Sequence, residues 1–191
     1  MDVDPGVTMP TSPDSKPAAT RDSLNGCWIL DKSQGEWSMA GYLQTMNVNE
    51  LAIQAHSKGE QEHDTFHTIE LDQKQVKITK RSRVNADIVV TLPLGEEHVD
   101  HLPPGDRPKT SLAESQHLGH LQIKSSLYTM NGMAKVTDVK ILERNVGGDP
   151  KNTRLVQTLT IENGQTGKTH TTTRYFIPYL KTPPHLAEEG S

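Results

Sequence analysis

From Thr65 onward the chain alternates polar and apolar residues with a period of two, and turn-forming residues interrupt the alternation at short intervals. Because successive side chains of a strand point to opposite faces, this pattern predicts a series of half-buried β-strands. Asn131-Gly132 and Asn163-Gly164 are the strongest hairpin signals, since both residue types tolerate positive φ. The predicted strands are Thr65–Leu71, Gln75–Arg83, Asp87–Leu94, Thr110–Gln116, Leu118–Tyr128, Ala134–Arg144, Arg154–Glu162 and Thr169–Pro178.

The segment before Thr65 follows a different pattern. Cys27–Leu30 is a short apolar run and predicts one further strand. After it, Tyr42 and Met46 lie four residues apart among good helix formers, a spacing that places them on one helical face. We therefore predict two short helices separated by a turn near Asn47–Asn49.

Many consecutive strands joined by tight turns favour an up-and-down antiparallel sheet. Such a sheet has to protect its edges, and a long meander does so by closing on itself. We expect an all-β fold, a closed up-and-down barrel of about ten strands, with the helix-turn-helix after the first strand forming a lid. The pair Glu96-Glu97 is interpreted as a solvated turn.

Composition limits the folded part of the chain. Of the 191 residues, 32% are hydrophobic, and residues 1–22 are polar and contain four prolines. A segment with so little to bury does not offset its ordering entropy, so we expect a disordered tail there and another at residues 181–191. The predicted barrel domain spans residues 23–180.

Charge and hydropathy exclude several classes of protein. The net charge is −4 and no basic stripe alternates with aromatic residues, which argues against a nucleic-acid partner. No apolar run approaches the ~20 residues of a membrane span, so we expect no stable membrane insertion, although transient membrane contact stays open. The start of the chain lacks the features of a signal peptide, which favours the cytoplasm. Cys27 is the only cysteine, so no disulfide or cysteine-based metal site is expected.

Motifs for catalysis and for metal binding are missing. The sequence contains no nucleophile elbow, P-loop or dinucleotide fingerprint. Pairs of histidines lie three or four residues apart, but in strands and turns these spacings do not bring two imidazoles to one metal ion. We expect a protein that is not an enzyme and that carries neither cofactor nor metal.

Five segments in the same order resemble the intracellular fatty-acid-binding and cellular retinoid-binding proteins of the calycin superfamily. They match the Gly-x-Trp of the first strand, the first helix, two segments in the middle of the chain and the Thr-Arg-x-Tyr of the last strand. The segments are Gly26–Trp28, Tyr42–Val48, Asn85–Glu97, Gly105–Ser111 and Thr173–Phe176.

This resemblance implies that the barrel binds a small hydrophobic ligand, a long-chain fatty acid or a retinoid-like amphiphile, and transports it as a monomer. In relatives an arginine and a tyrosine of the last strand and an arginine of an earlier strand hold the carboxylate, a task that suits the guanidinium fork. Here Arg174 takes the first position and Phe176 replaces the tyrosine. The second arginine is either Arg144 or Arg154. Tyr42 and Met46 of the lid are further candidate ligand contacts.

Two other functions stay open at this point. The barrel could have lost its ligand and act as a protein-interaction module through its surface. Less favoured is a haem-binding barrel of the nitrobindin type, which needs an inward histidine such as His120 or His170.

Overall fold

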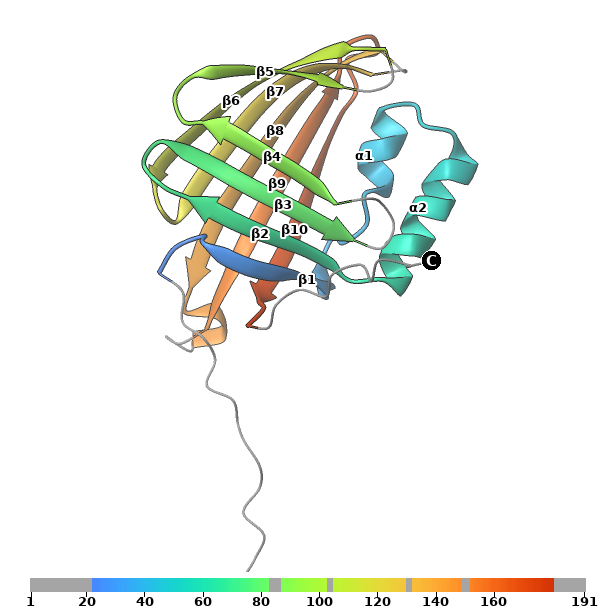
Figure 1. Ribbon diagram of the computed structural model, residues 1–191. Coiled ribbons are helices and arrows are strands. Elements are labelled where there is room, and N and C mark those ends of the chain that lie inside the picture. Colours follow the sequence, from blue (N-terminus) through green and yellow to red (C-terminus); the bar gives the residue numbers. More distant parts are fainter. Residues whose placement is uncertain (1–21, 83–86, 103–104, 130–131, 149–151, 181–191) are drawn as a thin grey trace, which may run out of the picture.

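The computed structural model describes residues 22–82, 87–102, 105–129, 132–148 and 152–180. These residues form ten antiparallel strands in one sheet (Figure 1). The strands are β1 (Gly26–Gly35), β2 (Thr65–Leu71), β3 (Gln75–Ser82), β4 (Ile88–Pro93), β5 (Glu97–Leu102), β6 (Arg107–His117), β7 (His120–Thr129), β8 (Gly132–Arg144), β9 (Thr153–Asn163) and β10 (Thr169–Pro178).

The sheet curls into a barrel that is nearly closed. Strand β1 pairs with both β2 and β10, so the first and the last strand of the chain are neighbours. The strand order is β4-β3-β2-β1-β10-β9-β8-β7-β6-β5. Strands β4 and β5 are therefore the two edges, and they are not paired with each other. Near one end of this gap, the Gly95 amide donates to the carbonyl of Ala113 over 2.8 Å. The predicted up-and-down barrel is confirmed, with an open seam between β4 and β5.

Two helices lie between β1 and β2, as predicted. Helix α1 spans Ala40–Thr45 and helix α2 spans Glu50–Glu62, and both cover one end of the barrel in Figure 1. The Asn49 side chain caps α2 by accepting a hydrogen bond of 2.9 Å from the Ala52 amide, which satisfies a free donor of the first turn. Helix α2 continues to Glu62 and is longer than the short helix expected.

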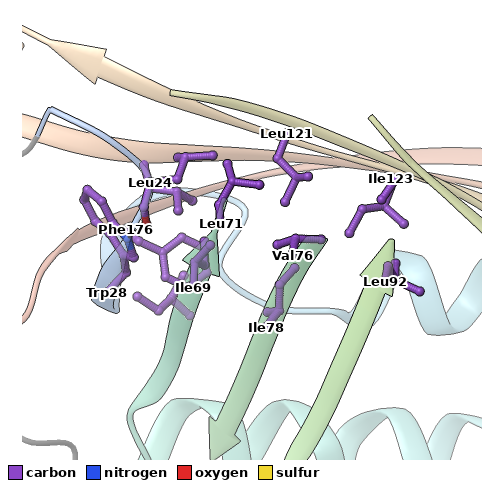
Figure 2. Packing of buried hydrophobic residues seen from close by; sticks show 13 residues of the cluster. Leu24, Trp28, Ile69, Leu71, Val76, Ile78, Leu92, Leu121, Ile123 and Phe176 are labelled. Atoms are coloured by element: carbon purple, nitrogen blue, oxygen red, sulfur yellow. Dashed lines mark hydrogen bonds between the residues drawn. The ribbon is translucent and has the colours of Figure 1, made fainter. Parts of the chain in front are cut away.

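The opposite end of the barrel is filled by apolar side chains. Trp28 is fully buried, and its indole N–H donates to the carbonyl of Leu24 over 2.7 Å, so it closes the barrel against the start of the domain. Figure 2 shows Leu121 and Ile123 on one side of the interior facing Val76, Ile78 and Leu92 on the other. We call this set the closed-end cluster, and its buried members are Leu24, Trp28, Leu30, Ile69, Leu71, Val76, Ile78, Leu92, Ala113, Leu121, Ile123, Leu155 and Phe176.

Two local expectations need correction. The residues after Glu96 do not remain in a turn, because Glu97 begins β5, a strand whose alternation is carried by charged and histidine side chains instead of apolar ones. The turn after β9 is longer than a two-residue hairpin. Here the Asn163 side chain accepts hydrogen bonds from the backbone amides of Gln165 and Thr166, and the backbone amide of Asn163 donates to the carbonyl of Lys168.

Some expectations fall beyond the described part of the chain. They are the two tails, apart from Asp22, the strand end Arg83, the start of the resembling segment at Asn85 and Ala86, and the hairpin residue Asn131. In the described residues, neither helix combines the length and the apolar character that crossing a bilayer requires.

Candidate functional site

The barrel contains a partly open cavity of about 370 Å³ between the closed-end cluster and the helices. A smaller space of about 190 Å³ adjoins it beneath α2, and the two share Met39, Lys80, Ile88 and Leu159 as lining residues. The larger volume lies within the range of about 300–1,000 Å³ usual for small-molecule sites. Its apolar lining includes Ile78, Val90, Leu92, Ile123, Leu127, Val136 and Leu159.

Charged side chains also lie in this interior, since Lys80, Lys109 and Asp138 line the larger cavity and Glu60 and Arg174 line the space beneath α2. The cations come from four strands, and the carboxylates come from β8 and from α2. The cations are Lys80, Lys109, Lys140 and Arg174, and the carboxylates are Asp138 and Glu60. Placing them here costs solvation energy, so their pairing decides what the site can bind.

One ion pair lies deep on β8. The Lys140 ammonium is fully buried, and its Nζ is 2.5 Å from Oδ2 of Asp138. The other oxygen, Oδ1, accepts a 2.9 Å hydrogen bond from the Gln157 amide. Burial lowers the pKa of Lys140 to about 8, against the attraction of Asp138. Burial opposes ionisation of Asp138, but the charges of Lys140 and Lys80 outweigh it and lower the pKa of the carboxyl. The carboxylate of Asp138 is thus engaged at both oxygens.

Arg174 of β10 lies inside the barrel, as the resemblance implies, but its partner comes from the lid. Nη2 of Arg174 is 3.3 Å from Oε1 of Glu60, and both side chains are about 6% exposed. The other oxygen, Oε2, accepts a 2.9 Å hydrogen bond from the Met39 amide and lies 3.3 Å from Nδ1 of His56. Burial raises the pKa of Glu60, but His56, the Met39 amide and the Arg174 charge together lower it below its usual value. The carboxylate of Glu60 therefore lies beside Arg174, where the resemblance implies the carboxylate of a ligand.

Phe176 shares the inward face with Arg174 and is fully buried. Its ring stacks on the imidazole of His67, with centroids 4.5 Å apart. Burial lowers the pKa of His67 well below its usual value, and the charges of Lys80, Lys140 and Arg174 act in the same direction, so His67 is neutral here. Phe176 thus belongs to the closed-end cluster and forms the apolar floor beneath Arg174.

The structure does not bring Arg144 or Arg154 to Arg174. Arg154 lies on the outer face of β9, where it binds Glu143 over 2.6 Å and covers the ring of Tyr175 at 4.3 Å. Arg144 is the last residue of β8 and donates to the carbonyl of Asp22 over 3.1 Å, outside the closed end. The expected pairing therefore needs correction, because the inward cation of this region is Lys140.

The two lid candidates differ in where they lie. Tyr42 of α1 lines the larger cavity, and burial together with the charge of Asp138 raises the pKa of its phenol to about 12. Met46 is buried against Ala134 and Ile161, in a second apolar cluster under α1. Of the two, only Tyr42 is among the lining residues of the cavity.

No protein-family model matches the sequence, and no curated protein matches it. Solved structures do match in fold. Lipid-binding protein 8 of Caenorhabditis elegans aligns with a TM-score of 0.58 at 16% identity, over 84% of this chain and 99% of its own. The fatty-acid-binding protein of Schistosoma mansoni, solved with arachidonic acid, gives a TM-score of 0.54 at 13% identity, over 83% and 97% of the two chains. Human cRBP IV gives 0.56 at 15% identity, over 83% and 100%.

The chain has the fold of the fatty-acid-binding and cellular retinoid-binding proteins. The resemblance in the sequence is confirmed at this level. At such low identities the likeness shows the fold alone, and the ligand is inferred from the residues of the cavity.

Within this fatty-acid-binding-protein fold, two cavity lysines were not anticipated from the sequence. Lys80 of β3 and Lys109 of β6 are half-buried, and both line the larger cavity. Neither forms an ion pair within 4 Å with any of the described residues. Burial lowers the pKa of Lys109 and the neighbouring charge of Lys80 lowers it further, against the attraction of Asp100 and Asp138. For Lys80 the alternation of β3 could have indicated an inward position, since Lys80 shares its parity with the buried Val76 and Ile78.

The histidines proposed for haem do not line the cavity. His170 lies 3.0 Å from a carboxylate oxygen of Glu36 and faces α1. His120 lies near His117 at the start of β7, with ring centroids 6.1 Å apart. Among the residues that the structure describes, no three histidine, cysteine or acidic side chains gather as a set of metal ligands.

Proposed function

We propose that this protein binds a hydrophobic ligand, a long-chain fatty acid or similar amphiphile, inside the barrel and transports it without a chemical step. The observation that carries the proposal is the largely apolar cavity of about 370 Å³ between the closed-end cluster and the lid. A barrel that had become an interaction module by filling its interior would lack this space. The fatty-acid, lipid and retinoid binding named for proteins of the same fold supports the proposal further.

Burial of the tail supplies the affinity in this proposal. Each methylene transferred from water to the apolar lining contributes about 0.8 kcal/mol, so a long alkyl chain gains far more than any single polar contact. The charged residues orient the ligand. With Asp138 engaged by Lys140 and Glu60 engaged by Arg174, the remaining cavity charges are the ammonium groups of Lys80 and Lys109. This surplus favours an acidic head group over a neutral one.

Entry requires the lid or the seam to move. Ile88, on the edge strand β4, lines both the larger cavity and the space beneath α2, so it lies where the two spaces meet. The unpaired edge of β4 and the helix α2 are the elements that can separate here without breaking a strand pair. We infer that ligand exchange takes place between them. The carrier is expected to act as a monomer in the cytoplasm.

The test is a displacement titration on delipidated protein. A fluorescent fatty-acid probe is bound first and then competed with oleate, with retinoic acid and with a neutral long-chain alcohol. We expect saturable displacement at one site, with the acids binding more tightly than the alcohol. Protein that is folded by circular dichroism and yet binds no probe would contradict the proposal.

A further inference from the structure

The two best-paired cations of the interior, Arg174 and Lys140, each already bind a carboxylate of the protein. Arg174 is bound by Glu60, which the Met39 amide also holds, and Lys140 is bound by Asp138. A ligand anion at either cation has to displace a carboxylate that belongs to the chain, leaving a buried charge without its partner. Such a loss is strongly unfavourable.

Lys80 and Lys109 present the opposite situation. They belong to β3 and β6, on either side of the seam, and they line one cavity together with apolar residues of the closed-end cluster. Asp138 also lines it, but both of its oxygens are engaged. Asp100 lies opposite Lys109 on β5, and its Oδ1 is 3.1 Å from Nε2 of His98 on the partly exposed seam. No carboxylate among the described residues lies within ion-pair distance of either lysine.

Two neighbouring ammonium groups beside an apolar cavity repel each other and lose solvation, so an anion between them is favourable. The charge of such an anion matters, because two unpaired cations are neutralised by a dianion and only half neutralised by a carboxylate. The geometry matters as well. An ammonium group binds phosphate as a compact point charge, so each lysine can contact a different oxygen of one tetrahedral dianion.

We propose that Lys80 and Lys109 form an anion subsite for the ligand's head group, and that the ligand is a single-chain lipid carrying a phosphate monoester. The inference rests on the proposed function, because it needs an amphiphile in the cavity. It moves the head group from Arg174, the position that the resemblance implies, to the seam between β4 and β5.

The experiment compares ligands with the same tail. Dodecyl phosphate, dodecanoate and dodecanol, with inorganic phosphate as a fourth competitor, are titrated against the bound fatty-acid probe. The proteins are the unchanged chain, Lys80→Gln and Lys109→Gln. Lys77→Gln is the matched control, since Lys77 lies on the outer face of β3, 3.1 Å from Glu70. Removing one of two like charges leaves the fold intact, which thermal melts verify.

We expect dodecyl phosphate to bind at least about tenfold more tightly than dodecanoate, in line with charge-assisted hydrogen bonds to two ammonium groups. Each cavity variant should lose about tenfold for dodecyl phosphate and leave dodecanol unchanged, while Lys77→Gln behaves as the unchanged chain.

Three results would overturn the inference and leave the proposed function standing. If dodecanoate binds as tightly as dodecyl phosphate, the ligand is not selected for a phosphate group. If the lysine variants bind dodecyl phosphate like the control, Lys80 and Lys109 do not form the subsite. If inorganic phosphate competes as well as dodecyl phosphate, the anion bound at the subsite is not a lipid head group. If none of the amphiphiles binds to folded protein, the proposed function itself fails together with the inference.

Discussion

Glu60 of α2 and Arg174 of β10 form a buried ion pair, with Oε1 3.3 Å from Nη2, that fastens the lid helix to the inside of the barrel. The two residues are 114 positions apart in the chain. Because Oε2 of Glu60 also accepts from the Met39 amide just before α1, one carboxylate near the end of α2 connects β10 with the start of α1. A buried ion pair therefore holds the lid helix α2 against β10.

Replacing Glu60 with leucine should destabilise the protein by about 3–5 kcal/mol, because Arg174 stays buried without its counter-charge. Denaturant unfolding gives this free energy, and hydrogen exchange should show the amides of α2 exchanging faster. The matched control is Glu62→Leu, whose carboxylate is half exposed and 3.9 Å from Lys58, a surface pair contributing about 0–1 kcal/mol. Equal losses in the two variants would show that the pair does not hold the lid.

Acid should weaken the same contact. The pKa of Glu60 is lowered in the folded protein, so the unfolded chain takes up the proton first as the pH falls. The stability contributed by Glu60 is fully present above its unfolded pKa of about 4.5 and is lost as the pH falls through the lower folded value. Urea unfolding from pH 7 to pH 3 should therefore show a steeper loss for the unchanged chain than for Glu60→Gln. Parallel curves would contradict this assignment.

Gly41 lets α1 approach β10 closely. A Cβ at this position would overlap the imidazole of His170, whose Nε2 is 3.0 Å from Glu36. Gly41→Ala should therefore push the helix or the ring aside and cost about 1–3 kcal/mol, as overpacking does. Thermal unfolding measures the effect. The double variant Gly41→Ala with His170→Ala removes the obstacle and should recover most of the loss, and a double variant as unstable as the single one would exclude steric conflict as the cause.

The deep pair of Asp138 and Lys140 should behave as a unit. Lys140→Met leaves Asp138 buried without its paired cation and with Gln157 as its remaining hydrogen-bond donor, at a cost of about 3–5 kcal/mol. Changing Asp138 to leucine as well removes the stranded charge, and the double variant should be much closer to the unchanged chain. The measurement is a double-mutant cycle by denaturant unfolding. Additive losses from the two single changes would mean that the residues act independently.

The sequence predicts most of the barrel because local pattern and turn chemistry agree. The strands Thr65–Leu71 and Thr169–Pro178 coincide with β2 and β10, where alternation is regular. Strand β5 is missed, because Glu97–Leu102 is stabilised by its pairing with β6 and shows little apolar alternation of its own. The seam beside it depends on the register of the whole sheet and leaves no local signal.

The site is predicted less completely. The resemblance places Arg174 correctly inside the barrel, but the partner Glu60 lies on a helix far away in the chain, and no local pattern indicates that it points inward. The inward lysines could have been predicted from strand parity, since Lys140 shares its parity with the buried Ala134 and Asp138 on β8. Strand parity thus predicts the buried charges better than the interval between arginines, which pointed to Arg154 on the outer face.

The most direct test of the central claim, that the ligand lies inside the barrel, is to fill the cavity with a larger side chain. Val136 lines the larger cavity from β8, so Val136→Trp occupies the space in which the ligand tail is proposed to lie. Its neighbour Lys135 points outward and is exposed, 3.9 Å from Glu162, so Lys135→Trp adds the same side chain outside the barrel.

Oleate is then titrated calorimetrically into delipidated protein at several temperatures. The unchanged chain and Lys135→Trp should bind one oleate with a negative heat-capacity change, the sign of apolar burial, and Val136→Trp should bind none while remaining folded. Unchanged binding by folded Val136→Trp would place the ligand outside the barrel and contradict the account.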